Sequence, residues 1–290
     1  MTRRAWEYVL LTFIVSWTTA GLFFISGAKL GLGFVGFGFP ILYMFFPLIV
    51  AWILFRKHHM GSFKEYIGLK FTWNRWFVFA WFLPILLGFD ILIMTLLMPG
   101  VSFSWEMQGL LKSFETMMTP EAFAQTKASM ETLPFHPFYL TLFQAIIAGI
   151  TINAVVAFGE EAGWRGYLYK ELEGMGFWKM SVVIGLIWGL WHAPLIAMGH
   201  NYPQHPTLGI FMMTLWTILL TPMFLIVRQK SHSVLAASVL HGSLNASAGL
   251  PLMLVVGGND LLNGWTGIAG FTILALLNVL LYLGMKRKIL

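Results

Sequence analysis

The chain has 290 residues, of which 58% are hydrophobic and only 10% are charged. A soluble domain has about 25% charged residues, so this composition indicates an integral membrane protein. The net charge of +6 is no sign of nucleic-acid binding, because the basic residues stand in loops between apolar runs. The absence of cysteine excludes disulfides, thiolate metal ligands and a cysteine nucleophile.

Apolar runs of about 18 or more residues predict membrane-spanning helices. The sequence contains about eight such runs, which predicts an all-α, polytopic membrane protein with one membrane domain over residues 1–290. The predicted spans are 6–28, 38–55, 75–98, 138–159, 180–199, 207–227, 233–256 and 262–285. The first run is too long for the apolar part of a signal peptide, so we interpret it as an uncleaved span.

The basic residues orient these spans. With eight spans, both termini and alternate loops share one side, and that side holds 15 of the 18 Lys and Arg residues. The other side holds Lys29, Lys112 and Lys127. Basic residues concentrate in cytoplasmic loops. We therefore expect both termini to be cytoplasmic and residues 160–165 to lie towards the cytoplasmic face.

The longest connection, about 99–137, is expected on the opposite side of the membrane. Its apolar residues follow a helical spacing and predict an interfacial amphipathic helix, either a surface anchor or a cap over a substrate entrance. These residues are Trp105, Leu110, Leu111, Phe114, Met117 and Met118. The third span contains a single acid, Asp90, which we interpret as structural because no partner is readable from the sequence.

Two adjacent carboxylates, Glu160 and Glu161, stand at the end of the fourth span. A charged side chain at the centre of a membrane helix costs about 2.5–3.5 kcal/mol on insertion scales, so the pair needs a reason. Neighbours on a helix point about 100° apart. Glu161 stands four residues before Arg165, the favourable order for a helical ion pair. Glu160 then remains free for chemistry.

Two polar pairs lie on later spans. His192 follows Trp188 by four residues, and Asn245 follows His241 by four residues, so each pair shares one face of its helix. Polar residues within spans normally face the bundle interior. We therefore expect one polar cavity, open towards the cytoplasm, to collect these residues with Glu160.

Such a cavity fits hydrolysis of an amide, with Glu160 as general base and His or Asn side chains donating to the oxyanion. It fits a zinc site equally, with Glu160, His192 and His241 as ligands, because two His and one Glu form a known zinc ligand set. The residues alone leave both open. Other intramembrane hydrolases fit worse, since His-Glu-x-x-His, a pair of spanning aspartates and Gly-x-Ser-Gly are all missing.

The three motifs, in this order, resemble the CPBP family. It comprises the CAAX prenyl proteases of the Ras-converting type and their bacterial relatives, often called Abi or bacteriocin-processing proteins. The motifs are Glu160-Glu161-x-x-x-Arg165, Trp188-x-x-x-His192 and His241-x-x-x-Asn245. The resemblance covers about 138–256, the predicted catalytic core. The family's second motif usually starts with Phe, and Trp188 keeps an aromatic ring at that place.

The resemblance implies an eight-helix intramembrane endopeptidase that acts on a membrane-associated protein or peptide. It implies that Glu160 and His192 activate water. It further implies that His241 and Asn245 stabilise the oxyanion. The residues implied to orient the site are Glu161, Arg165 and Trp188. Members have been described both as metalloproteases and as glutamate proteases, and the substrate stays open.

We predict catalysis by Glu160 without a cofactor, in the lipid bilayer and with no nucleic-acid partner. One alternative is a zinc protease that uses the same residues. Another is a non-catalytic scaffold that regulates a partner, although a decayed homologue tends to lose motif residues and all are present here. A small-solute transporter would need ionisable residues lining a path to both faces, and few stand towards the outer face.

Overall fold

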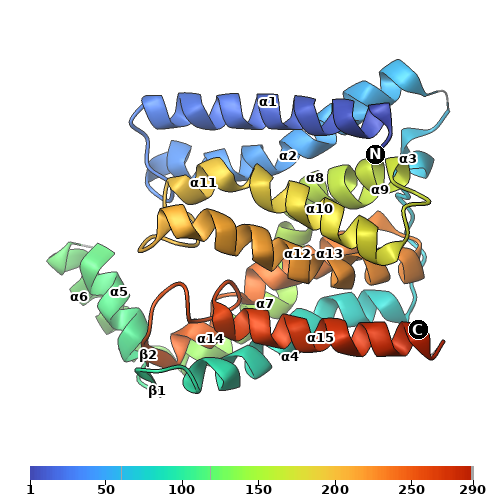
Figure 1. Ribbon diagram of the computed structural model, residues 1–290. Helices are drawn as coiled ribbons and strands as arrows, with labels where there is room; N and C mark the ends of the chain where they lie inside the picture. The colour runs from blue at the N-terminus through green and yellow to red at the C-terminus, as the bar shows by residue number, and fades with distance from the viewer. Residues whose placement is uncertain (60, 118, 289–290) are drawn as a thin grey trace.

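The computed structural model describes residues 1–59, 61–117 and 119–288. Long helices run side by side along one direction of the molecule (Figure 1). Five of them are long and apolar enough to cross a membrane in the described part of the chain. They are α1 (Arg3–Ile25), α2 (Gly33–His58), α4 (Arg75–Leu96), α12 (Pro206–Ser231) and α15 (Ile268–Lys286).

The other three predicted spans also coincide with helices, but these are bent or short. The fourth consists of α7 (Pro137–Ile150) and α8 (Ile152–Glu161), and the two helical parts meet at a bend of 47°. Counting this pair as one span gives up to six among the described residues. The fifth contains α10 (Phe177–Trp191) and the seventh α13 (Val234–Ser247), with 15 and 14 residues. The predicted all-α, polytopic fold is confirmed, with fewer helices of full spanning length than the apolar runs suggested.

The bend in the fourth span packs closely against α13. Thr151 has φ −113° and ψ −104°, outside the helical region. Gly242 of α13 lies directly against the break, since a Cβ there would stand 2.4 Å from the Gly149 carbonyl oxygen and 2.5 Å from the Ala154 nitrogen. Only glycine allows this approach, so a tertiary contact accompanies the break in an otherwise continuous apolar run.

A small non-helical part lies at the end of the molecule away from the termini (Figure 1). There β1 (Val101–Phe103) pairs antiparallel with β2 (Val255–Gly257). Next to it, α5 (Gln108–Met117) and α6 (Pro120–Glu131) project from the bundle. The expected amphipathic helix is found as α5, and Met118 lies outside the described residues. This two-stranded sheet was not expected from the sequence, because strands of three residues are too short to show a recognisable alternation of apolar and polar residues.

The remaining helices are short. They are α3 (Phe63–Tyr66), η1 (Ala162–Leu168), α9 (Tyr169–Glu171), α11 (Ala193–Ala197) and α14 (Leu250–Met253). Of these, η1 is a π-helix that continues α8 directly. A π-helical turn inside a helix is uncommon and often marks a functional site.

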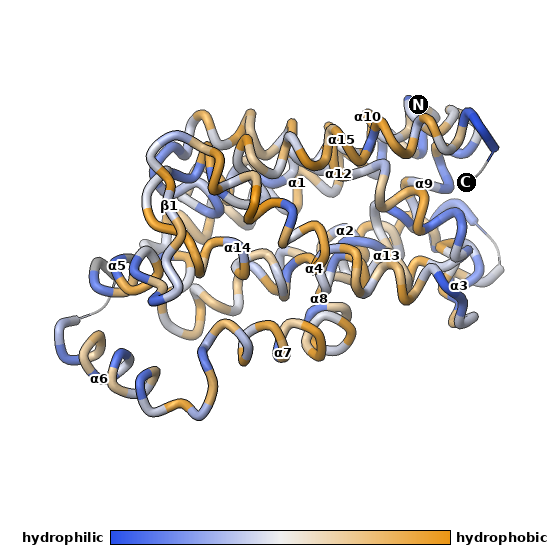
Figure 2. The backbone as a smooth tube through the Cα atoms, turned by 90° about the horizontal axis from the view of Figure 1, so that it is seen from below, coloured by the Kyte–Doolittle hydropathy of each residue, from blue (hydrophilic) through white to orange (hydrophobic). Residues whose placement is uncertain are grey.

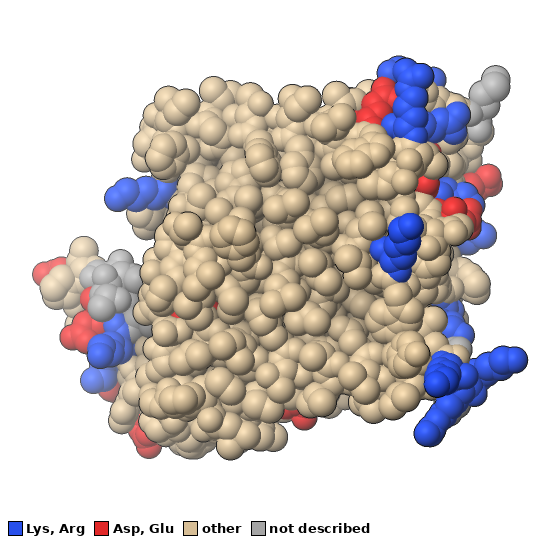
Figure 3. All heavy atoms as spheres, viewed as in Figure 1, with Lys and Arg blue, Asp and Glu red and all other residues tan. Residues whose placement is uncertain are grey.

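The polarity of the surface changes along the direction of the long helices. Hydrophilic residues concentrate at the two ends, and the long helices are hydrophobic between them (Figure 2). Lys and Arg gather at the end that carries both termini, and the middle of the face shown is almost free of them (Figure 3). Large apolar side chains are exposed along the long helices, for example Phe211, Leu22 and Leu280. Hydrocarbon chains of a bilayer would cover such a surface.

Candidate active site

The predicted ion pair at the end of α8 exists and is buried. Arg165 Nη1 donates to Glu161 Oε1 at 3.1 Å, and both side chains are inaccessible to solvent. Glu160 is also buried, with 2% of its surface exposed. Buried charges are tolerated when they are paired and hydrogen-bonded. The motif therefore places an ionic cluster inside the apolar core, at the junction of α8 and η1.

His241 of α13 joins this cluster through Glu161. Its Nδ1 lies 2.8 Å from Glu161 Oε1, so Nδ1 donates to the carboxylate and Nε2 points elsewhere. The second oxygen of Glu161, Oε2, is buried and has no partner among the described residues. Glu161, the last residue of α8, thus links that helix to α13. The sequence had not indicated that His241 would contact Glu161 directly.

Glu160 is held from α10. The indole Nε1 of Trp188 donates to Glu160 Oε2 at 2.7 Å. No hydrogen bond from the described residues reaches the other carboxylate oxygen, Oε1. The guanidinium carbon of Arg165 lies 4.2 Å from the centre of the Trp188 ring, and the His241 ring lies 5.6 Å from it. Trp188 therefore contacts Glu160, Arg165 and His241.

His192 is positioned by the end of α10. Its backbone N–H donates to the Gly189 carbonyl at 3.1 Å, which leaves the Trp188 carbonyl without that helical partner. The His192 imidazole takes this place, because Nδ1 lies 2.8 Å from the Trp188 oxygen and must donate to it. Pro194, which has no N–H, follows in the first turn of α11. The helix break thereby fixes the tautomer of His192 and leaves Nε2 as the unprotonated nitrogen of the neutral ring.

Asn245 lies apart from these residues. It stands one turn after His241 on α13, but its side chain is exposed whereas His241 is buried. No hydrogen bond within the described residues connects it to the cluster. The structure thus brings together Glu160, Glu161, Arg165, Trp188, His192 and His241, and it leaves Asn245 at the surface. The predicted oxyanion role of Asn245 stays a prediction.

Sequence reasoning missed the contribution of α12. Thr221 Oγ1 accepts a hydrogen bond from Arg165 Nη2 at 3.3 Å, and the Phe224 ring covers the guanidinium with its centre at 4.3 Å. Arg228, which the charge pattern placed in a loop, is mostly buried and donates through Nε to the Arg165 carbonyl at 3.0 Å. Thr and Phe are ordinary in apolar helices and gave no signal. The sequence marked Arg228 only as a basic residue directly after the predicted span 207–227, whereas α12 continues past it to Ser231.

The sequence left open a zinc site at Glu160, His192 and His241. No group of three His, Asp or Glu side chains is arranged to hold a metal ion in the described parts of the chain. The Nδ1 atoms of His192 and His241 are bound to protein oxygens, and one oxygen of Glu160 is bound to Trp188. Histidines that bind a metal through Nε2 commonly make the same Nδ1 bonds, so these contacts do not exclude the ion. Whether the reaction needs a cofactor stays a prediction.

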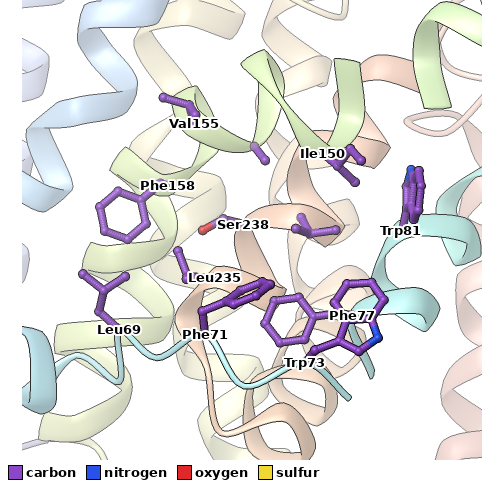
Figure 4. Close-up of a pocket in the computed structure, with 12 residues that line it drawn as sticks. Leu69, Phe71, Trp73, Phe77, Trp81, Ile150, Val155, Phe158, Leu235 and Ser238 are labelled. Atoms are coloured by element: carbon purple, nitrogen blue, oxygen red, sulfur yellow. The ribbon is translucent and has the colours of Figure 1, made fainter. Parts of the chain in front are cut away.

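An apolar pocket of about 570 Å³ is lined in part by α8 and α13, which also carry cluster residues (Figure 4). The segment 69–73, α4, the α7–α8 bend and α13 form its walls. The lining residues are Leu69, Phe71, Trp73, Phe77, Trp81, Ile150, Ala154, Val155, Phe158, Leu235, Ser238 and Val239. The Ser238 hydroxyl donates to the Val234 carbonyl and is not free. The lining of this pocket is apolar. The polar cavity expected around Glu160 stays a prediction.

The pocket and the cluster share two helices. Phe158 stands two residues before Glu160 on α8, and Ser238 stands three residues before His241 on α13. Along the chain, the pocket lining therefore comes within one helical turn of Glu160, Glu161 and His241, although Phe158 and Glu160 point to nearly opposite sides of α8.

Comparisons with known proteins bear on the same region. Residues 139–247 match the family described as Type II CAAX prenyl endopeptidase Rce1-like. The chain is 31% identical over 96 residues to CAAX prenyl protease 2 of Methanococcus maripaludis. That alignment covers 30% of this chain and only 34% of the relative's length. The matched family segment includes every motif residue from Glu160 to Asn245. Residues 139–247 of this chain are therefore similar to the Rce1-like CAAX prenyl endopeptidases.

Proposed function

We propose that this protein is an intramembrane endopeptidase that hydrolyses a peptide bond in a membrane-associated protein or peptide. The observation that carries the proposal is the buried cluster around Glu160, whose carboxylate is held on one oxygen by Trp188. A carboxylate buried in a membrane protein without a metal or ion partner of its own is costly to maintain and is a candidate for function.

In the proposed reaction, Glu160 Oε1 and His192 Nε2 bind the attacking water. The water oxygen forms a bond to the substrate carbonyl carbon, and its proton moves to Glu160. The carbon–nitrogen bond then breaks, and the same proton passes to the leaving amine. The products are a carboxylic acid, which then ionises in water, and a free amine, so Glu160 returns to its starting state.

His241 is the candidate oxyanion donor. Its Nδ1–H donates a hydrogen bond to Glu161, and its Nε2 would donate to the oxyanion of the tetrahedral intermediate when the ring carries both protons. Arg165 balances the Glu161 charge from the other side. Asn245 would add a second donor if its side chain turned from the surface towards the substrate. This division of roles makes Glu161 a positioning residue and Glu160 the base.

The pocket supports a substrate that carries a long apolar group. Its aromatic and aliphatic walls would bind a hydrocarbon chain by burial of apolar surface. The relative named above is a CAAX prenyl protease, and a prenyl group is such a chain. We therefore propose a prenylated or similarly lipid-modified peptide as the substrate, held with its peptide bond at Glu160 and its chain in the pocket.

The test uses purified protein in vesicles with matched peptides that carry or lack a farnesyl group. The wild type should release a new C-terminus from the farnesylated peptide, and Glu160→Gln should lower turnover by at least about a thousandfold with little change in melting temperature. Membrane proteomics of wild type against Glu160→Gln would identify natural substrates.

Full activity of Glu160→Gln with loss of activity in Glu161→Gln would reverse the roles of the two glutamates. A protein that cleaves neither peptide and whose membranes show no new termini would be a scaffold.

Exhaustive removal of metal tests the mechanism separately. We expect turnover to survive it, because the described side chains do not converge as metal ligands. Stoichiometric zinc in the active protein, with activity lost on chelation and restored by zinc, would overturn the glutamate mechanism in favour of the metal one.

A further inference from the structure

Asp90 is an acid at membrane depth that the proposed reaction does not use. It stands on α4 six residues before Leu96, about 9 Å along the helix axis from that end. Its side chain is exposed, and within the described residues it forms no hydrogen bond or ion pair. An aspartate side chain is too short to reach the membrane surface from this depth. The acid therefore faces the region that hydrocarbon chains would fill.

Asp90 lines a groove of about 330 Å³ between α4 and α15. The other lining residues are Leu87, Ile93, Met94, Ile273, Leu276, Leu277 and Leu280. On each helix these positions recur every three or four residues, so the two walls are neighbouring helix faces. Ile93, Leu276 and Leu280 are more than half exposed. A third helix packs against two others by placing its ridges into this kind of groove.

We propose that the α4–α15 groove binds a membrane-spanning helix of a partner protein that carries a Lys or Arg at the depth of Asp90. An acid or a basic residue exposed to hydrocarbon costs about 2.5–3.5 kcal/mol on insertion scales. Pairing relieves this cost for both helices, so the two charges select each other. The apolar residues around Asp90 supply the packing contacts and exclude water from the pair.

Two other occupants fit less well. An amine of a lipid headgroup lies at the membrane surface and would have to enter the hydrocarbon by about 9 Å to meet Asp90. A second copy of this chain offers no suitable cation. Its described Lys and Arg side chains lie near helix ends, in loops or on the projecting helices α5 and α6. The exceptions are Arg165 and Arg228, which are buried and hydrogen-bonded inside the protein. The complementary charge must come from a different helix.

The experiment measures binding of a synthetic spanning peptide to the full-length protein in lipid vesicles by energy transfer. The probe is an alanine–leucine helix with one Lys six residues from its membrane end, and the matched control has norleucine there. The Lys peptide should bind the wild type about three- to thirtyfold more tightly than the control, as one polar pair between membrane helices allows. Asp90→Asn should remove the difference. Asp90→Lys should instead prefer a peptide with Asp at that position, which shows that the variant is folded.

Space in the groove provides a second test. Leu276→Trp should weaken binding of the Lys peptide, whereas Ile14→Trp, on the exposed face of α1, should not. Equal affinity for the Lys and norleucine peptides, or an unchanged preference in Asp90→Asn, would overturn the proposal. Dimers that form without peptide and disappear in Asp90→Asn would assign the groove to a second copy instead. The assay involves no proteolysis, so its failure is distinguishable from failure of the proposed function.

Discussion

Trp188 connects the catalytic candidates at the level of single atoms. Its indole N–H binds Glu160, its carbonyl binds His192, and its ring lies under the Arg165 guanidinium. A phenylalanine, usual at this place in the resembled family, would keep the ring and the carbonyl but could not donate to a carboxylate. The tryptophan of this chain therefore adds a contact that fixes the rotamer of Glu160.

Replacing Trp188 with Phe tests that contact. A hydrogen bond to a charged group contributes about 1.5–3 kcal/mol, so Trp188→Phe should lower kcat roughly ten- to a hundredfold if the bond orients the base. KM and the melting temperature should change little, because the ring stays in place. The measurement is steady-state cleavage of the substrate peptide.

Trp216→Phe is the matched control for this prediction. Trp216 is also buried, but its Nε1 has no partner among the described residues. Its replacement removes an indole N–H that binds nothing, and kcat should stay close to that of the wild type. Equal kcat values for the two variants would show that the N–H of Trp188 does not position Glu160.

At the scale of elements, η1 is held from three sides. Glu161 and Arg165 bind each other at its start, Thr221 of α12 accepts from Arg165, and Arg228 donates to the Arg165 carbonyl. The guanidinium lies between the rings of Trp188 and Phe224. A π-helix is rare, and we expect these side-chain contacts to stabilise η1.

Arg165→Ala should therefore destabilise the protein strongly. It leaves the Glu161 carboxylate buried without its cation and opens a cavity between two rings, a change that typically costs about 3–5 kcal/mol. Lys170→Ala is the control, because the Lys170–Glu173 pair three residues apart is exposed. An exposed pair contributes about 0–1 kcal/mol. Thermal unfolding in detergent compares the two, and similar melting temperatures would mean that the buried pair does not stabilise η1.

At the scale of the molecule, charge is separated along the bundle. Both termini, α3 and α9 lie at the end where Lys and Arg gather, and the α5–α6 hairpin lies at the other end (Figures 1 and 3). The positive-inside rule predicts that the basic end faces the cytoplasm. The membrane-facing surface between the ends is apolar, apart from groups such as Asp90.

Single cysteines test this orientation, because the natural chain has none. Lys230 and Lys112 are both exposed and lie at opposite ends of the bundle. Lys230→Cys should react with an impermeant thiol reagent only after the inner face is opened, and Lys112→Cys should react from outside. Arg228 would be a poor probe, since it is buried and binds η1. Labelling of both cysteines from the same side would contradict the topology.

The sequence by itself determined the class of protein, the helices and the positions of the motif residues. Apolar runs and i,i+4 pairs are local patterns, so they indicated the helices and the Glu161–Arg165 ion pair directly. They also named Trp188, His192 and His241, which the structure brings to one cluster with Glu160. Asn245 shows the limit of this reasoning, because it shares a helix face with His241 and is nevertheless exposed where α13 ends.

Only the tertiary structure decided which partner each side chain has. His241 binds Glu161 and Trp188 binds Glu160 across 80 and 28 residues of chain, and such contacts depend on how α8, α10 and α13 pack. The bend at Thr151 arises beside Gly242, which no local pattern marks. In a bilayer, helices form from local hydrogen bonds alone, whereas their association depends on close packing between surfaces that look equally apolar in sequence.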